Sequence, residues 1–269
     1  MGSWNRVALR SMADIIAELS QANTLAIEES RPGIGLMSVN RPDRGNSQTI
    51  EMFGEIAWYA HTLRKAPLRA LIITGAGGAT FCTGFDLAEV EVITKMTIPE
   101  FNELVDTASA GTSGLRALPF PVIAAISGPV AGGGLSLALS ADIRLAGPSA
   151  SFSAGFVRVG LSIGELGASW HLSRVIGPAR AAEISFTGRT VKADEAVRMG
   201  LANRIVAGGN VVAAAIELAE SVAANGAEGV RATKNSLIRN AEVTSFLAAL
   251  ELENRSQVVC RTTLRRLAE

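Results

Sequence analysis

Cysteine, histidine and tyrosine are scarce in this chain of 269 residues, which contains two cysteines, two histidines and one tyrosine. Two cysteines, Cys82 and Cys260, are too few for a disulfide scaffold and fit a reducing compartment. The few histidines and cysteines, taken with the aspartates, form no group with the spacing of a metal site. We therefore expect neither a disulfide framework nor a bound metal.

A net charge and a long apolar run are also missing. The 25 lysines and arginines balance 25 aspartates and glutamates, so no overall charge attracts nucleic acid or an anionic membrane. No apolar run approaches the roughly 20 residues that a membrane span requires. An apolar content of 48% is ample for a sizeable core. These features predict a soluble, cytoplasmic protein with no nucleic-acid partner and no membrane span.

Glycine, by contrast, is plentiful, and three glycines stand in a row within residues 121–144, PVIAAISGPVAGGGLSLALSADIR. The pattern predicts a buried strand over 121–126, a tight turn over 127–134 and a helix from about Gly133. Glycines leave no Cβ in the turn, so a ligand can reach the backbone N–H groups at the helix N-terminus. Such a turn can hold an anion or an oxyanion. No phosphate-binding glycine motif can be read here, and close packing of helix on strand is the purely structural alternative.

A second stretch, residues 68–89 (LRALIITGAGGATFCTGFDLAE), repeats this arrangement. An apolar strand over 70–74 ends in a glycine-rich loop, and a short helix is expected to begin near Asp86. Two strand-turn-helix units, each with a free backbone N–H, can stabilise one developing oxyanion from two sides.

Four segments, taken in order, resemble the crotonase (enoyl-CoA hydratase/isomerase) superfamily: NRPDRGNS at 40–47, TGAGGATFCTGFDL at 74–87, ISGPVAGGGLSLALSADIRLA at 126–146 and FTGRTVKADEAVRMGLANRIV at 186–206. As a group they are far more specific than any single motif. The resemblance implies an α/β fold, a crotonase-like ββα spiral with a helical C-terminal region. It also implies an acyl-CoA thioester as the partner, in fatty-acid or acyl-CoA metabolism, with no cofactor because coenzyme A is part of the substrate.

The same resemblance divides the chain into three parts. Residues 1–22 form an N-terminal helical extension, residues 23–200 a spiral core with the acyl-CoA site, and residues 201–269 a helical C-terminal trimerisation region. The expected assembly is a homotrimer or a dimer of trimers, that is, a hexamer.

By resemblance, the backbone N–H groups of Phe85 and Gly133 hold the thioester oxygen, and Asp86, Leu87 and Ala88 continue the acyl-CoA contact. Two fixed N–H groups stabilise the enolate that forms when an acyl thioester loses its α-proton. Arg44 becomes a candidate contact for a phosphate of coenzyme A. A solvated loop arginine is the alternative for that residue.

The chain departs from the family where hydratases carry two glutamates, one to activate water and one to protonate the α-carbon. Ser136 and Phe156 stand at these positions, and neither has a carboxylate. Glu165, in GLSIGELGASW, remains as a candidate base whose pKa an apolar, glycine-flanked loop would raise. Its alternative is an acid in the first turn of a helix over 166–176.

We therefore expect an enzyme of this family, an isomerase or lyase that acts through a thioester enolate, with Glu165 as the single acid and base. A non-catalytic acyl-CoA-binding or regulatory protein stays open as the alternative, because of Ser136 and Phe156. Cys82 has no histidine near it in sequence and is expected to be a small buried thiol. His171 is expected to be packed beside Trp170, with a role in proton transfer as the alternative.

Other elements follow from the apolar spacing. An amphipathic helix that packs on its own or a neighbouring subunit is predicted by Leu9, Met12, Ile15, Ile16 and Leu19. Residues 24–28 and 33–40 predict a hairpin, and residues 48–65 a helix.

A Thr-x-x-Glu capping box, Thr97 to Glu100, predicts the start of a helix that carries Phe101, Leu104, Val105 and Ala108 inward over the acyl pocket. After residues 177–178 the spacing predicts helices only, over 180–186, 192–199, 211–224, 229–239 and 245–261.

Overall fold

A six-stranded sheet lies at the centre of the fold in the computed structural model, which describes residues 10–268 and the side chains of residues 10–261. In spatial order its strands are β1 (Leu25–Arg31), β2 (Ile34–Val39), β3 (Ala70–Gly75), β4 (Val122–Ile126), β6 (Ile143–Ala146) and β9 (Arg204–Ile205). Strands β1 and β2 are antiparallel, with Leu25 opposite Val39, and this confirms the predicted hairpin. The other neighbouring strands are parallel, as crossover connections through helices require.

A second, three-stranded sheet consists of β5 (Pro129–Ala131), β7 (Ser151–Ser153) and β8 (Thr190–Lys192). Strand β5 lies inside the segment that the sequence predicts as a turn, and it pairs with β7 in parallel. The prediction of helices alone after residues 177–178 is wrong, because β8 and β9 both follow that point. Strands of two or three residues carry no alternation that a sequence pattern can reveal.

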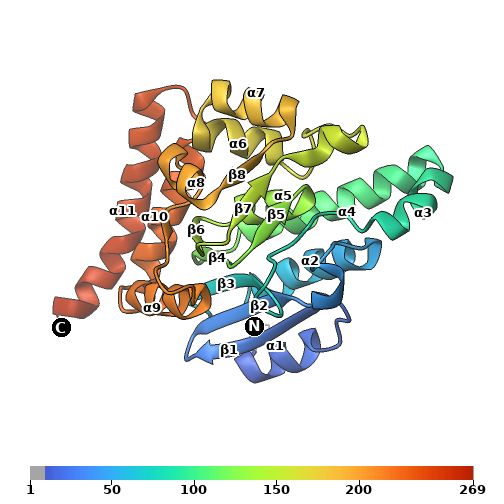
Figure 1. Cartoon of the computed structure of the whole chain (residues 1–269). Coiled ribbons are helices and arrows are strands. Elements are labelled where there is room, and N and C mark those ends of the chain that lie inside the picture. Colours follow the sequence, from blue (N-terminus) through green and yellow to red (C-terminus); the bar gives the residue numbers. More distant parts are fainter. Residues whose placement is uncertain (1–9, 269) are drawn as a thin grey trace.

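The helices surround these sheets (Figure 1). They are α1 (Met12–Leu19), α2 (Ile50–Leu63), α3 (Val90–Lys95), α4 (Ile98–Arg116), α5 (Gly133–Ser140), α6 (Ala168–Ile176), α7 (Pro178–Thr187), α8 (Ala193–Met199), α9 (Val211–Ala223), α10 (Ala227–Asn240) and α11 (Phe246–Ala268). Short 3-10 turns, named η1 (Pro42–Arg44), η2 (Leu87–Glu89) and η3 (Gly155–Val159), lie between them. No helix within residues 10–268 is both long enough and apolar enough to cross a membrane.

Helix α4 begins at the predicted capping box, in which Thr97 Oγ1 accepts from the N–H of Glu100 and the Glu100 carboxylate accepts from the N–H of Thr97. Leu104 and Ala108 face inward as expected. Phe101 does not, because it belongs to none of the buried clusters and its side chain is 40% exposed. The prediction that Phe101 faces the interior is therefore wrong.

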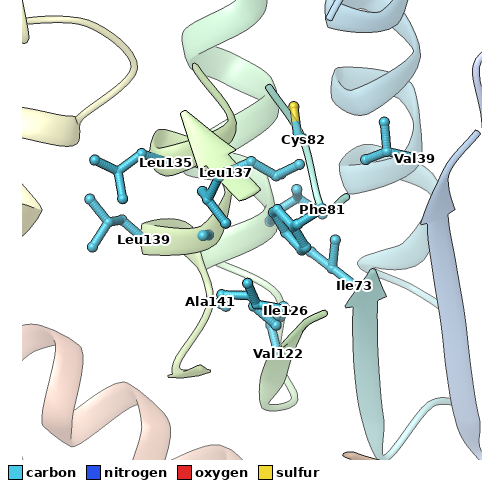
Figure 2. Packing of buried hydrophobic residues seen from close by; sticks show 14 of the residues in the cluster. Val39, Ile73, Phe81, Cys82, Val122, Ile126, Leu135, Leu137, Leu139 and Ala141 are labelled. Atoms are coloured by element: carbon cyan, nitrogen blue, oxygen red, sulfur yellow. The ribbon is translucent and has the colours of Figure 1, made fainter. Parts of the chain in front are cut away.

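Each face of the six-stranded sheet is covered by its own apolar cluster. Side chains alternate along β3, so Ile72 faces α9 while Ile73 faces the main core. Figure 2 shows Phe81 within that core, together with Ile73 of β3 and Leu137 of α5. The predicted boundary at residue 200 falls between α8 and β9, and β9 is the last strand of this same sheet, on which α9 also packs.

The helix predicted near the N-terminus is present as α1 and packs on its own chain. Met12, Ile15 and Leu19 are buried in the main core, whereas Leu9, also predicted on this face, lies outside the described residues. The Tyr59 hydroxyl donates to the Leu19 carbonyl at 2.9 Å, and this bond fixes the end of α1 on α2.

Candidate active site

The two glycine-rich turns lie against each other, and Gly84 is one of the points of contact. An ideal Cβ built on Gly84 would lie 2.8 Å from the Ala131 carbonyl oxygen and 3.3 Å from Gly132 Cα. The backbone at Gly84 has a φ of +89°, which also favours glycine. Beside it the Ala131 N–H donates to the Cys82 carbonyl at 3.0 Å. The loop after β3 and the turn after β4 thus form one continuous surface.

The direction of the Phe85 N–H is set by a neighbouring segment. The Gln48 N–H donates to the Gly84 carbonyl and the Asp86 N–H donates to the Gln48 carbonyl, both at 2.7 Å. In a trans peptide the C=O of one residue and the N–H of the next point in opposite directions. The Gly84 carbonyl accepts from Gln48, so the Phe85 N–H points away from Gln48. No residue in the described part of the chain accepts a hydrogen bond from it.

Gly133 is the first residue of α5, as the sequence predicts. The N–H groups of Leu135 and Ser136 both donate to the Gly132 carbonyl, at 2.8 and 3.3 Å, and they begin the helical turn. The N–H of a first helical residue has no acceptor within its own helix. Among the described residues none outside the helix accepts from Gly133 either. The two N–H groups that the sequence singles out are thus unpaired and belong to neighbouring turns.

Gln48 was missed at the sequence level, although it directly follows the segment 40–47. Its side chain is fully buried, and an ideal Cβ on Gly133 would lie 2.0 Å from Gln48 Oε1. Neither polar atom of this amide has a hydrogen-bond partner among the described residues. A glutamine after an Asn-Ser pair carries no distinctive sequence signal, so only the fold could reveal it.

Arg44 and Asp86 belong to one ion-pair network. Asp86 is buried and accepts from Arg44 at 3.0 Å, from Arg41 at 2.9 Å and from the Ser47 hydroxyl at 3.1 Å. Hydrogen bonds, the one from Arg44 foremost, hold the pKa of the Asp86 carboxyl well below its usual range. The carboxylate also accepts from the Ala88 N–H at 3.0 Å and so caps η2. Asp86 is therefore ionised and fixes the loop that carries Phe85.

A pocket of roughly 380 Å³ opens beside this network. It is lined by Asp43, Arg44, Ser47, Thr83, Phe85, Asp86 and Leu87. Arg44 has a 55% exposed side chain, so its remaining N–H groups are accessible there. The Phe85 ring stacks on Phe53, with ring centroids 6.0 Å apart. Phe53 and Leu166 bury this side of the site in a small apolar cluster.

Glu165 lies in the loop before α6 and is close to Ser136. The Ser136 hydroxyl donates to the Glu165 backbone carbonyl at 3.4 Å, so Glu165 lies beside Ser136. Phe156 is buried in the main core. Burial raises the pKa of the Glu165 carboxyl above its ordinary value. A half-buried carboxyl with raised proton affinity is a better base than an exposed one and is suited to accept and return a proton.

Helix α6 begins later than the sequence suggests. Leu166 and Gly167 have φ values of +49° and +78°, so the helix starts at Ala168 and its first turn contains no acid. The interpretation of Glu165 as an acid within that first turn is therefore wrong.

The two other reactive side chains considered from the sequence are unsuited to direct chemistry. His171 packs edge-on against Trp170, as expected. Burial, with the nearby charge of Arg116 as a further cause, lowers the pKa of His171 to about 4, so the ring is neutral at pH 7. Cys82 is fully buried, and burial raises the pKa of its thiol to about 12. A nucleophile needs the thiolate, which Cys82 does not form at neutral pH.

A larger pocket of roughly 660 Å³ lies where β4 and β6 begin, between these strand ends and helices α9 to α11. Lys234 reaches it from α10 and is buried, with Nζ 2.8 Å from an Asp142 oxygen and 2.9 Å from the Phe120 carbonyl. The glycine turns follow the opposite ends of the strands, so this pocket is separate from them. Within the described residues no group of three or more His, Cys, Asp or Glu side chains is arranged to hold a metal ion.

Comparisons with known proteins agree with one another. The family profile described as enoyl-CoA hydratase/isomerase matches residues 29–264. Over 261 residues the chain is 36% identical to the probable enoyl-CoA hydratase echA12 of Mycobacterium bovis, with 94% of this chain and 90% of the relative covered.

Solved structures extend the comparison. A candidate enoyl-CoA hydratase from Thermobifida fusca YX, in complex with acetoacetyl-CoA, superposes with a TM-score of 0.80 at 29% identity, and 94% of this chain and 98% of that chain are covered. A monofunctional enoyl CoA isomerase from M. smegmatis superposes with a TM-score of 0.71 at 34% identity, and the coverage is 84% and 98%.

Proposed function

This chain belongs to the enoyl-CoA hydratase/isomerase family, as an enzyme of that family, and we propose that it binds an acyl-CoA thioester and isomerises it through an enolate. Acyl-CoA binding is supported by the similar structure that contains acetoacetyl-CoA. The observation that carries the proposal is the pair of unpaired N–H groups, of Phe85 and Gly133, on two turns that touch at Gly84.

These two groups are the proposed oxyanion hole. When an acyl thioester loses a proton from C2, negative charge builds up on the carbonyl oxygen. Backbone N–H groups that are already fixed in place stabilise this charge without reorganising at the moment of reaction. Loss of one such donor typically costs about 3 kcal/mol of barrier height, roughly a hundredfold in rate.

Glu165 is the proposed proton carrier. In a 3-enoyl thioester, Glu165 removes a proton from C2, the double bond moves into conjugation with the carbonyl, and the same carboxyl returns the proton at C4. One acid-base group completes this reaction, and no water is consumed. Hydration needs one group to activate a water and another to protonate C2. By resemblance, Ser136 and Phe156 stand in this chain where hydratases carry the glutamates for these two steps, and neither side chain has a carboxylate.

The rest of the substrate is proposed to lie along the pocket of roughly 380 Å³. Arg44, with its exposed guanidinium, is the proposed contact for a phosphate of coenzyme A, and Leu87 and Ala88 line the path of the acyl-CoA between phosphate and thioester. The C-terminal helices are the proposed contact in a homotrimer or a dimer of trimers. Exposed apolar side chains on α11, such as Phe246 and Leu247 at 75% exposure each, support this assembly.

The test is proton exchange at C2 in deuterated water, followed by NMR, with a saturated and a 3-enoyl-CoA as substrates. We expect Glu165→Gln to slow exchange and isomerisation by roughly 10²- to 10⁴-fold while binding is retained. Glu217→Gln, which changes an exposed glutamate on α9, is the matched control and should exchange like the wild type. Unchanged exchange in Glu165→Gln would exclude Glu165 as the proton carrier. Tight binding without any exchange in the wild type would favour the non-catalytic acyl-CoA-binding alternative.

A further inference from the structure

The side-chain amide of Gln48 lies between the two turns of the proposed oxyanion hole. Its backbone pairs with Gly84 and Asp86, on either side of Phe85, and so fixes the direction of the Phe85 N–H. The end of its side chain reaches the first residue of α5, since Oε1 would stand 2.0 Å from a Cβ on Gly133. One residue is therefore in contact with both parts of the site.

This amide is also unsatisfied. A carboxamide offers two N–H donors and an oxygen with two lone pairs. Gln48 is fully buried, yet neither its Nε2 nor its Oε1 has a partner in the part of the chain that the structure describes. Among the other side-chain atoms of that part, only Asn240 Oδ1 is both buried and without a partner, and the amide nitrogen of that residue is bonded. A buried polar group without a partner is costly, so such a group calls for a functional explanation.

An amide at this place is suited to donate rather than accept. The charge that develops between the Phe85 and Gly133 N–H groups is negative, and it attracts N–H donors. No hydrogen bond holds the Gln48 amide in one orientation, so a half-turn about its terminal bond can direct Nε2 toward Gly133. Because the amide is buried, a hydrogen bond made there competes with little water.

We propose that the Gln48 side-chain amide is a third donor to the thioester oxygen, beside the two backbone N–H groups. The inference rests on the proposed function, because it places the same oxygen in the same hole. Gln48 is then a catalytic residue, because its hydrogen bond is made to the acyl thioester and not to free CoA. The same hydrogen bond becomes stronger when the thioester turns into the negatively charged enolate. A side-chain donor also makes one part of the hole accessible to mutation, which the two backbone donors do not allow.

The test compares the wild type with Gln48→Met, which keeps the length of the side chain and removes both polar atoms. Isotope-edited infrared spectra of bound acyl-CoA, labelled with ¹³C at the carbonyl, report the hydrogen bonds to the thioester oxygen. We expect the wild type to lower the carbonyl stretching frequency relative to free acyl-CoA, and Gln48→Met to reverse part of that shift. Exchange at C2 should slow roughly ten- to a hundredfold, and affinity should fall for acyl-CoA but not for CoA.

Stability provides a second readout. Removal of an unpaired buried amide should raise the melting temperature of the ligand-free protein by a few degrees, while the increase in melting temperature on adding acyl-CoA becomes smaller. A residue with a purely structural role would instead lower the melting temperature. Gln257→Met, on α11, controls for the loss of an amide far from the turns and should leave the carbonyl frequency unchanged.

The outcomes separate the two proposals. A wild-type carbonyl frequency equal to that of free acyl-CoA would overturn the proposed function and this inference together. A lowered frequency that is the same in the wild type and in Gln48→Met would overturn the inference and leave the two-donor hole intact. If Gln48→Met is less stable than the wild type and retains full exchange, Gln48 is a packing residue only.

Discussion

Gly84→Ala is the substitution that most directly tests how the two glycine turns build the site. At a φ of +89°, an alanine pays the usual penalty of a left-handed conformation, roughly 1–2 kcal/mol. Its Cβ would also lie 2.8 Å from the Ala131 carbonyl oxygen, a backbone atom that cannot rotate away as a side chain does. The residue pair must separate by several tenths of an ångström, so we expect a total loss of about 2–4 kcal/mol in the free energy of unfolding.

The displacement should affect the reaction more than the fold. Ala131 precedes Gly132 and Gly133, so a movement of this segment shifts one proposed donor relative to the other. A misplacement of about 1 Å at a reacting centre typically costs roughly a hundredfold in rate. A displacement of several tenths of an ångström is about half of that, so we expect C2 exchange in Gly84→Ala to slow by roughly tenfold, as measured by NMR in deuterated water.

Gly78→Ala is the matched control in the same loop. Gly78 has a similar φ of +71°, but a Cβ there meets no atom within 4 Å. It should lose only the conformational penalty, roughly 1–2 kcal/mol in urea unfolding, and keep its exchange rate. Equal destabilisation and equal exchange in the two variants would refute the reasoning, because contact between the turns would then contribute nothing.

Three further predictions concern ionisable groups. Burial raises the pKa of the Glu165 carboxyl, so at a pH just above 4.5 the folded protein keeps a carboxyl proton that the unfolded chain has already lost. The free energy of unfolding therefore decreases as pH rises past 4.5. Glu165→Gln should therefore be more stable than the wild type at pH 7 but not at pH 4 in urea unfolding, and it should lack the acid limb of the exchange profile. The pKa of His171 is lowered to about 4, so between about pH 6.5 and 4 the unfolded chain binds more protons and stability falls as pH falls. Between pH 7 and pH 5 the free energy of unfolding of His171→Gln should fall by about 1 kcal/mol less than that of the wild type, a value discounted for partial exposure. An unchanged dependence of the free energy of unfolding on pH would contradict this. Lys234→Met leaves the Asp142 carboxylate without its ammonium partner and should cost about 2–3 kcal/mol in urea unfolding, whereas a neutral result would mean that water replaces the pair.

Much of the frame of the site could be predicted from local sequence. The Thr97 capping box and the glycines that open α5 depend on contacts within a few residues, so their patterns predict them well. The family could also be identified, because its motifs occur in a fixed order, and the comparisons confirm it. The roles of Phe85, Gly133 and Glu165 in turnover stay predictions.

Other features depend on partners far away in the chain. Asp86 is ionised because Arg44, which lies 42 residues earlier, donates to it. Strand β5 exists because Ser151–Ser153 lies alongside it, and three residues alone contain no periodic pattern. Phe101 was expected to face inward, but whether a helix face is covered depends on what packs there and not on its own spacing.

Local sequence was enough to place a glycine-rich turn after each of two strands, because glycine and helix start signals act over a few residues. Tertiary structure alone decided that the turns touch at Gly84, that Glu165 comes beside Ser136, and that the Gln48 amide is enclosed between the turns without a partner. The physical reason is the range of the interactions. Backbone conformation is set mainly by nearest neighbours, whereas burial, pKa and the pairing of a polar group depend on atoms that only the folded chain brings together.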